Sequence, residues 1–274
     1  MMSYPLNTPV GRFGIRDVDQ GPTTYSATLP VAAWRNPFTG APSLAAVGVL
    51  VDHIAGYPNH ARRPDGHWTV TSELAIEFCP DAQHTLTTDD AAPIMATSRT
   101  LGVPTGTSLS VCDLTHGGRP IGHATIRSFY IGAGSGNANP PGPEPESDSI
   151  LPTDLSDLLA VEVAEPGGAA GGARVLRQHP HPAINNHLGA VHGGIVAAGL
   201  ELVAAAALNT DPAQRPLHTA SLRINYLRRL VGGGQAHYRG TALHAGRSSG
   251  VAEAQGIDAD GRLALTARLT AYRD

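Results

Sequence analysis

Residues 186–208 read NHLGAVHGGIVAAGLELVAAAAL. Between Leu188 and Leu208 only His192 and Glu201 are polar. A helix that is apolar on every side is buried, either in the core of a domain or in a membrane. Ala and Gly dominate this run, an acid stands in its middle, and no second such run follows. We therefore predict the buried central helix of a soluble domain, with no membrane span.

A related pattern occurs in the first half of the chain. Residues 44–57, LAAVGVLVDHIAGY, form a shorter apolar helix pattern with a single acid, Asp52. Each helix pattern is followed by an alternating pattern that predicts a strand: TSELAIEF from Thr71 and TASLRINY from Thr219. In the second half the acid is Glu201. The chain therefore contains an internal repeat.

The repeat continues downstream and defines two units. Residues 96–130 parallel residues 238–272, each with a strand, a Gly-Arg turn and a second strand. Between the halves, residues 132–149 are rich in Gly, Pro and Ser, as linkers are. We predict an N-terminal unit over residues 1–140 and a C-terminal unit over residues 141–274.

Composition excludes several classes of protein. The 274 residues carry 19 Lys and Arg against 23 Asp and Glu, a net charge of −4 without runs of like charge, which argues against nucleic-acid binding. The two cysteines, Cys79 and Cys112, have no spacing that suggests a disulfide framework or a zinc site. No metal or redox cofactor is predicted. The first residues have no signal-peptide pattern, so we expect a cytoplasmic protein.

The start of the second helix has a chemical role of its own. Gly193 and Gly194 place backbone N–H groups without intrahelical partners at the positive end of the helix dipole. Such a terminus polarises a carbonyl and stabilises a developing oxyanion. Asn186 has a side-chain N–H that serves the same purpose or positions a water. His192 either caps the helix or transfers a proton, and we favour the cap.

These residues resemble the hotdog-fold thioesterase superfamily, in particular acyl-CoA thioesterases of the phenylacetate-pathway type. Asn186, the His-Gly-Gly motif at residues 192–194 and the acid that follows carry the resemblance, which covers residues 151–274 and, more weakly, 12–131. It implies an α+β fold in which an antiparallel sheet wraps around a central helix. Two such units in one chain would form a double hotdog, a pseudo-dimer. The implied activity is hydrolysis of an acyl thioester.

The resemblance also assigns roles to residues. It implies that the Gly193 N–H and the Asn186 amide polarise the carbonyl. It also implies that Asp52 or Glu201 is the nucleophile or general base. The hydroxyl that orients water would belong to Thr71 or Thr219. The residues leave open whether the acid attacks the carbonyl or activates water.

Spacing indicates which residues combine. Gly193 and Glu201 are eight residues apart, about 12 Å along one helix. Both cannot touch one thioester, so the acid that faces Gly193 must be Asp52 of the other unit, with Thr71. A reciprocal site would join Glu201 and Thr219 to the first helix, but Ser43-Leu44-Ala45 stands where the glycine corner is expected. We expect one competent site and one degenerate site.

The expected substrate is an acyl-CoA or an acyl-carrier thioester. Both leaving groups carry phosphate, so Arg228, Arg229 and Arg247 are candidate substrate-binding residues, together with His192 and Gly194. Each arginine is equally compatible with a solvated surface. We also expect that two such chains can form a homodimer.

Two other functions remain open at this stage. A non-catalytic protein that binds acyl thioesters is one, because the first unit lacks the glycine corner. A hotdog dehydratase or hydratase is the other, but it needs a His–acid pair that no spacing indicates. A G-x-S-x-G motif at residues 246–250 precedes a strand-like segment rather than a helix, so we set the α/β-hydrolase interpretation aside.

Overall fold

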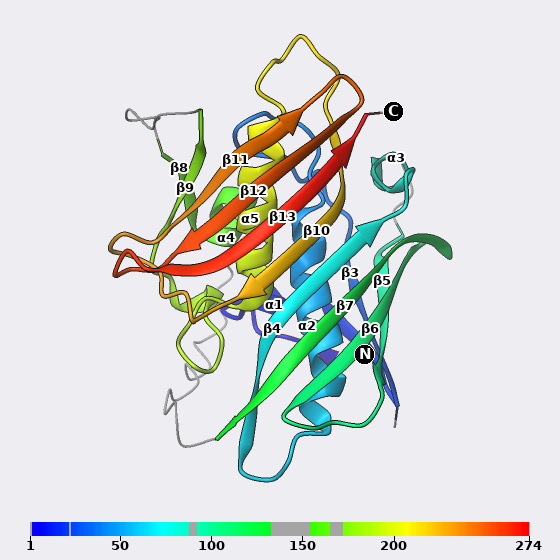
Figure 1. Cartoon of the computed structure of the whole chain (residues 1–274). Helices are drawn as coiled ribbons and strands as arrows, with labels where there is room; N and C mark the ends of the chain where they lie inside the picture. The colour runs from blue at the N-terminus through cyan, green and yellow to red at the C-terminus, as the bar shows by residue number, and fades with distance from the viewer. Residues whose placement is uncertain (1, 22, 88–91, 133–153, 165–171, 274) are drawn as a thin grey trace.

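The computed structural model describes residues 2–21, 23–87, 92–132, 154–164 and 172–273 (Figure 1). The helices are α1 (Pro9–Arg12), α2 (Ala45–Ala61), α3 (Ala82–Thr87), α4 (Leu155–Leu159) and α5 (Gly193–Leu208), with a 3-10 helix at Pro182–Ile184. The strands are β1 (Met2–Ser3), β2 (Arg16–Gln20), β3 (Thr24–Leu29), β4 (His67–Phe78), β5 (Ile94–Leu101), β6 (Thr107–His116), β7 (Arg119–Gly132), β8 (Val161–Val163), β9 (Arg174–Gln178), β10 (His218–Tyr226), β11 (His237–Ala245), β12 (Ser249–Ile257) and β13 (Leu263–Tyr272).

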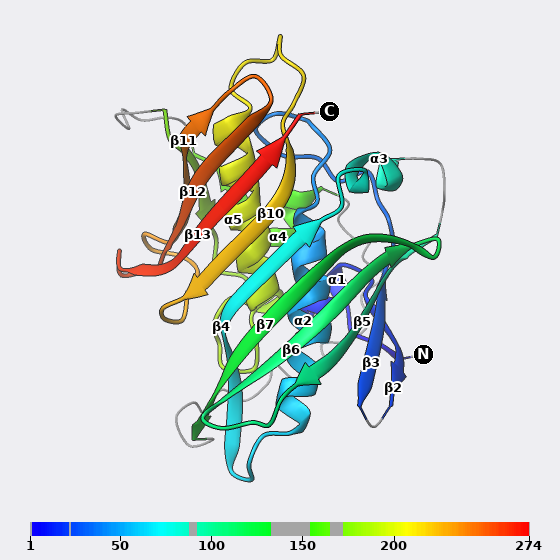
Figure 2. The ribbon, with the colours of Figure 1, turned by 45° about the vertical axis from the view of Figure 1, so that its right-hand side comes forward.

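The strands of the described ranges form one continuous antiparallel sheet. Its order is β1-β2-β3-β5-β6-β7-β4-β10-β13-β12-β11-β9-β8. The long helices α2 and α5 lie side by side against the same face of this sheet (Figure 1). In Figure 2, β3, β5, β6 and β7 curve around α2, on the side away from α5. The core is therefore the space between the two helices and the sheet that covers them.

Strands β4 and β10 join the two halves of the sheet. Leu74 pairs with Ile224 and Ile76 pairs with Leu222. Since the repeat matches Leu74 to Leu222 and Ile76 to Ile224, an approximate two-fold axis relates these two pairs. The inward side chains of all four residues are buried. The sheet thus passes from one half of the chain to the other without a break in its hydrogen bonding.

Helices α2 and α5 cross in antiparallel directions at close range. A Cβ atom on Gly48 would lie 3.1 Å from Cβ of Ala197, and one on Gly194 would lie 2.5 Å from Cα of Val49. Small residues therefore permit the backbones to approach. The antiparallel direction places the start of α5 beside the middle of α2, where Asp52 lies.

Helix α5 is buried on every side, as the sequence predicts. It begins at Gly193 and ends at Leu208, and a Cβ atom on Gly199 would lie 2.6 Å from the ring of Tyr238 on β11. The ring of Tyr238 fits against the helix only because residue 199 has no side chain. Within the described ranges, none of the helices is long and apolar enough to cross a membrane.

The first helix is longer than the predicted range 44–57. It continues through Pro58 to Ala61. Proline removes one helical hydrogen bond. The next residue, Asn59, is fully buried and bonds to the sheet through its side chain. The Asn59 amide donates to Ser110, Ser128 and the carbonyl of Ile126 at 3.1–3.2 Å. These bonds fix the end of α2 on the sheet.

The predicted matching turns are confirmed. Gly118 lies between β6 and β7, Gly261 lies between β12 and β13, and both have φ of 79°. Only glycine adopts this left-handed conformation without strain. Of the predicted linker over residues 132–149, all but Gly132 lies outside the described residues.

Candidate active site

Asp52 of α2 lies against the start of α5. Its Oδ2 accepts a hydrogen bond of 2.8 Å from the Gly194 N–H, and its Oδ1 accepts one of 3.0 Å from the Thr71 hydroxyl on β4. The carboxylate is 9% exposed, so these partners replace most of its contact with water. The structure therefore brings together the acid, the hydroxyl and the glycine corner, as the spacing predicts.

Gly193 is the point of closest contact with this carboxylate. A Cβ atom on Gly193 would lie 2.7 Å from Oδ2 and 2.9 Å from Oδ1 of Asp52. These separations are shorter than a side chain tolerates. Glycine at position 193 therefore leaves the space that the Asp52 carboxylate on the opposite helix occupies. This role adds to its position at the helix N-terminus.

His192 caps helix α5, as we favour from the sequence. Its Nδ1 accepts a hydrogen bond of 3.1 Å from the Gly194 N–H and lies 3.4 Å from Oδ2 of Asp52. Burial lowers the pKa of the imidazole and outweighs Asp52, which favours the charged form. The ring is therefore neutral at neutral pH and serves as an acceptor for the helix backbone.

Two further residues shape the corner. The Tyr226 hydroxyl donates a hydrogen bond of 3.0 Å to the carbonyl of Gly193. Burial raises the pKa of Tyr226 well above its ordinary value, so the phenol keeps its proton. Asn186 uses its Oδ1 to accept bonds from the N–H groups of Leu188 and Ala190, at 2.9 and 3.2 Å. Asn186 therefore holds the loop that leads into α5.

A cavity of about 1100 Å³ adjoins this corner. This volume is slightly above the usual range for small-molecule sites, roughly 300–1,000 Å³. Asp52, Thr71 and Gly193 line it, and so does His60, eight residues or about 12 Å further along α2. Tyr4, Pro5 and residues 7–10 form part of another wall. The cavity therefore lies between the two halves of the chain and has the candidate acid on its surface.

The three candidate arginines divide between two places. Arg228 and Arg229 are exposed and line the cavity. Arg247 lies in the turn between β11 and β12 and does not line it; Gly250, three residues on, packs against Leu208 at the far end of α5. The expectation that Arg247 is near the same cavity is thus not met, because the turn is at the opposite end of the helix from Gly193.

Glu201 and Thr219 form a separate cluster. Glu201 is 4% exposed and accepts hydrogen bonds from Thr219 at 2.6 Å and from Ser43 at 3.1 Å. The adjoining cavity has a volume of about 20 Å³, which holds about one water molecule. The Asn36 side chain also fills this region and donates to the carbonyl of Leu202. The cluster has the residue types of the Asp52 site but no space for a substrate.

The Glu201 cluster gives a prediction about stability. Burial raises the pKa of Glu201 above its ordinary value of 4.5, against the hydrogen bonds from Thr219 and Ser43. The folded chain holds this proton more tightly than the unfolded chain. The resulting stability is complete below about pH 4.5 and declines as pH rises through the folded pKa.

Glu201→Gln is neutral at every pH and should remove that decline. Thermal unfolding over a pH series should show that the Tm of the variant, relative to the Tm of the wild type, increases as pH rises. Asp65→Asn, at an exposed carboxyl between α2 and β4, serves as the control and should give a constant difference. A constant difference for Glu201→Gln as well would contradict the raised pKa.

Comparison with known proteins bears on the fold. Residues 188–265 match the model of the thioesterase superfamily. Over 94% of the chain, the fold is similar to a TesB protein of Mycobacterium avium subsp. paratuberculosis, with a TM-score of 0.62, 12% identity and 95% of that chain covered. The chain has the hotdog fold that these solved structures share.

Other solved structures share this hotdog fold. Acyl-CoA thioesterase II TesB2 from Mycobacterium marinum has a TM-score of 0.59 at 12% identity, with 94% of this chain and 95% of that chain covered. The 12:0-ACP thioesterase from Umbellularia californica has a TM-score of 0.59 at 11% identity, covering 92% and 94%. No curated protein matches the sequence. At these identities the structural likeness supports the fold.

Two residues that line the cavity, Tyr226 and His53, are not identified as site residues from the sequence. Tyr226 matches Phe78 in the repeat, and only its hydroxyl distinguishes it. His53 follows Asp52 directly, lines the cavity and pairs with Asp17 of β2. Asp17 and His53 are far apart in the chain and belong to no common motif. The position of His53 directly after Asp52, in the apolar first part of α2, is the sequence signal for it.

Proposed function

We propose that this chain hydrolyses acyl thioesters, with acyl-CoA as the first substrate class to test. The observation that carries the proposal is the Asp52 carboxylate, held by Thr71 and the start of α5 on the wall of a large cavity. A carboxylate, a hydroxyl and a helix N-terminus at one point are the groups that water activation and carbonyl polarisation require.

We also propose how the two halves contribute. Residues 1–140 and 141–274 are taken as two hotdog units, joined near residues 132–149, that form a pseudo-dimer within one chain. The symmetric pairing of β4 with β10 and the antiparallel pairing of α2 with α5 support this division. The active cavity then takes Asp52 and Thr71 from the first unit and the glycine corner from the second.

In this mechanism Asp52 acts as a general base. Both carboxylate oxygens already accept a hydrogen bond, and each keeps a further lone pair for a water molecule. Asp52 takes a proton from that water, which attacks the thioester carbonyl. The N–H of Gly193, with the amide of Asn186, stabilises the oxyanion as it forms. The tetrahedral intermediate then collapses and releases the thiol.

The phosphate groups of the substrate have candidate partners at the cavity edge. Arg228 and Arg229 line the cavity from the segment that follows β10 and are exposed there. Guanidinium groups bind phosphate through paired hydrogen bonds. In this proposal they bind the leaving group, so the acyl group occupies the part of the cavity along α2.

A second candidate function is hydration of an enoyl thioester. The 3.4 Å approach of His192 to Asp52 favours it, since such chemistry uses a histidine with an acid. However, the Nδ1 of His192 already accepts the Gly194 N–H. We therefore place hydrolysis first.

The test is release of free thiol from a panel of acyl-CoA and acyl-carrier thioesters, with short, long and aromatic acyl groups. Enoyl thioesters in the same panel are followed by loss of the conjugated chromophore. Thiol release supports the proposal. Binding of a non-hydrolysable acyl-CoA analogue without thiol release on any substrate would make the chain an acyl-thioester binding protein.

A further inference from the structure

A second carboxylate–histidine pair faces the proposed active cavity. Asp17 of β2 is 3% exposed, and its Oδ1 lies 2.8 Å from Nε2 of His53 on α2. His53 lines the cavity, whereas Asp17 stands behind it. The pair therefore has a buried acid that orients a histidine toward the space in which the substrate would lie.

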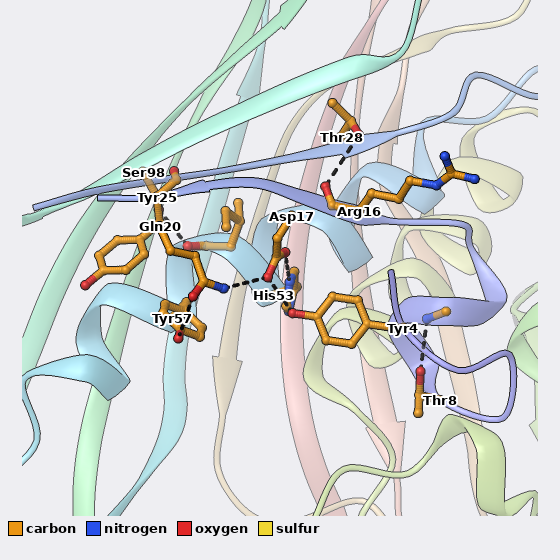
Figure 3. Close-up of polar contacts among 12 residues, drawn as sticks. Tyr4, Thr8, Arg16, Asp17, Gln20, Tyr25, Thr28, His53, Tyr57 and Ser98 are labelled. Carbon is orange, nitrogen blue, oxygen red and sulfur yellow. Dashed lines mark hydrogen bonds and ion pairs between the residues drawn. The ribbon is translucent and has the colours of Figure 1, made fainter. Parts of the chain in front are cut away.

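The Asp17 carboxylate is held from three sides. The Tyr4 hydroxyl donates to Oδ2 at 2.5 Å and the Gln20 amide donates to the same atom at 2.9 Å. Figure 3 shows Tyr4, Gln20 and His53 all directed at this carboxylate. Burial opposes ionisation, but the bonds from His53, Tyr4 and Gln20 outweigh it and lower the pKa of Asp17. Asp17 is therefore an anion with fixed partners.

The orientation of His53 determines which ring nitrogen exchanges protons. A carboxylate at Nε2 accepts the Nε2–H, so that the proton which comes and goes is the one on Nδ1. The ring is also fixed by an edge contact with Tyr4, with centroids 5.1 Å apart. The anion and the tyrosine together fix the ring and its tautomer.

His53 lies within electrostatic range of the proposed reacting groups. It follows Asp52 directly in α2, and both line the same cavity. Burial lowers the pKa of His192, and the charge on His53 lowers it further. Asp17, Tyr4, Tyr57, Asp52 and His192 are the titratable groups around His53.

We propose that His53, positioned by Asp17, is the general acid that protonates the departing thiolate. The inference rests on the proposed function. Asp52 removes one proton from water, the resulting hydroxide bonds to the carbonyl carbon, and the carbon–sulfur bond breaks. The sulfur takes the proton from Nδ1 of the His53 imidazolium. The Asp52 proton then returns the neutral His53 to its charged form, and the product carboxylic acid loses its own proton to solvent. The products are therefore a carboxylate, a thiol and one proton.

The test compares leaving groups in the variant His53→Gln. Glutamine keeps a donor for Asp17 near the position of Nε2 but has no proton to transfer. Hydrolysis of acyl-CoA, whose alkyl thiolate is basic, should slow by about 10²-fold or more. Hydrolysis of the matching aryl thioester should stay near wild type, because an aryl thiolate leaves without protonation.

A matched control comes from a second histidine–aspartate pair. His123 and Asp113 lie 2.9 Å apart with both side chains largely exposed, and His123 does not line the cavity. His123→Gln should leave both thioesters unaffected. Asp17→Asn should also slow acyl-CoA hydrolysis more than aryl thioester hydrolysis, but by a smaller factor than His53→Gln. The reason is that it weakens the hydrogen bond that orients the His53 ring.

The pH dependence gives a second readout. The imidazolium is the active form, so wild-type kcat on acyl-CoA should fall as pH rises and His53 loses that proton. His53→Gln should lose that fall. Equal slowing of both thioesters by His53→Gln would overturn the proposal and assign His53 a structural role. A wild-type chain that hydrolyses neither thioester would instead overturn the proposed function.

Discussion

Asp52→Asn is expected to lower kcat for thioester hydrolysis by about 10²–10⁴-fold while the chain stays folded. The asparagine oxygen still accepts a hydrogen bond from Thr71 or from Gly194, so the contact between α2 and α5 is largely kept. The amide, however, cannot take a proton from water. Thiol release at saturating acyl-CoA measures the effect, and Tm shows that the fold is retained.

Glu201→Gln is the matched control for this experiment. Glu201 occupies the equivalent helix position in the other half, but its cavity of about 20 Å³ has no space for a substrate. We expect activity close to wild type. If Asp52→Asn left hydrolysis intact and Glu201→Gln abolished it, the Glu201 cluster would be the active site and the Asp52 site would not.

Gly193→Ala should have the second large effect. The new methyl group would lie 2.7 Å from Oδ2 of Asp52, so the carboxylate must move. A displacement on the order of 1 Å of a catalytic group costs about 10²-fold in rate. The displaced atoms are the end of a side chain, so the fold should tolerate the change. We expect a loss of kcat with a small change in Tm.

Gly194→Ala should behave differently. Its methyl group would meet Cα of Val49 at 2.5 Å and the carbonyl of Gly48 at 2.9 Å, both backbone atoms of α2. The helices would have to separate, and overpacking of this kind costs about 1–3 kcal/mol. Tm should therefore fall for Gly194→Ala and not for Gly193→Ala. Equal losses of Tm in both variants would contradict the distinction.

Much of this arrangement is predictable because it repeats along the chain. The apolar helices, the acid in each and the threonine that follows are local patterns, and the internal repeat predicts their pairing. The distance between Gly193 and Glu201 along one helix requires the partner acid to come from elsewhere. These arguments need only periodicity and helix geometry, and the contact between Asp52 and Gly193 agrees with them.

The remaining features depend on contacts that no pattern encodes. The pairing of Asp17 with His53 joins a short strand to a helix, and Tyr4, the residue after β1, reaches the same carboxylate. Arg247 shows the opposite case: the strand that follows it is predicted, but which end of α5 its turn covers depends on the sheet order. Side-chain partners across a sheet are set by packing, and a single sequence records them only through residue type.

The antiparallel helix pair has a consequence for redesign. In a dimer of identical subunits, every substitution enters both pockets, so a change that helps one also alters the other. Here residues 43–45 and 192–194 are encoded separately, although they occupy equivalent places on the two helices. A library that varies residues around the small Glu201 cavity can therefore enlarge it for a new ligand while the Asp52 pocket keeps its native residues.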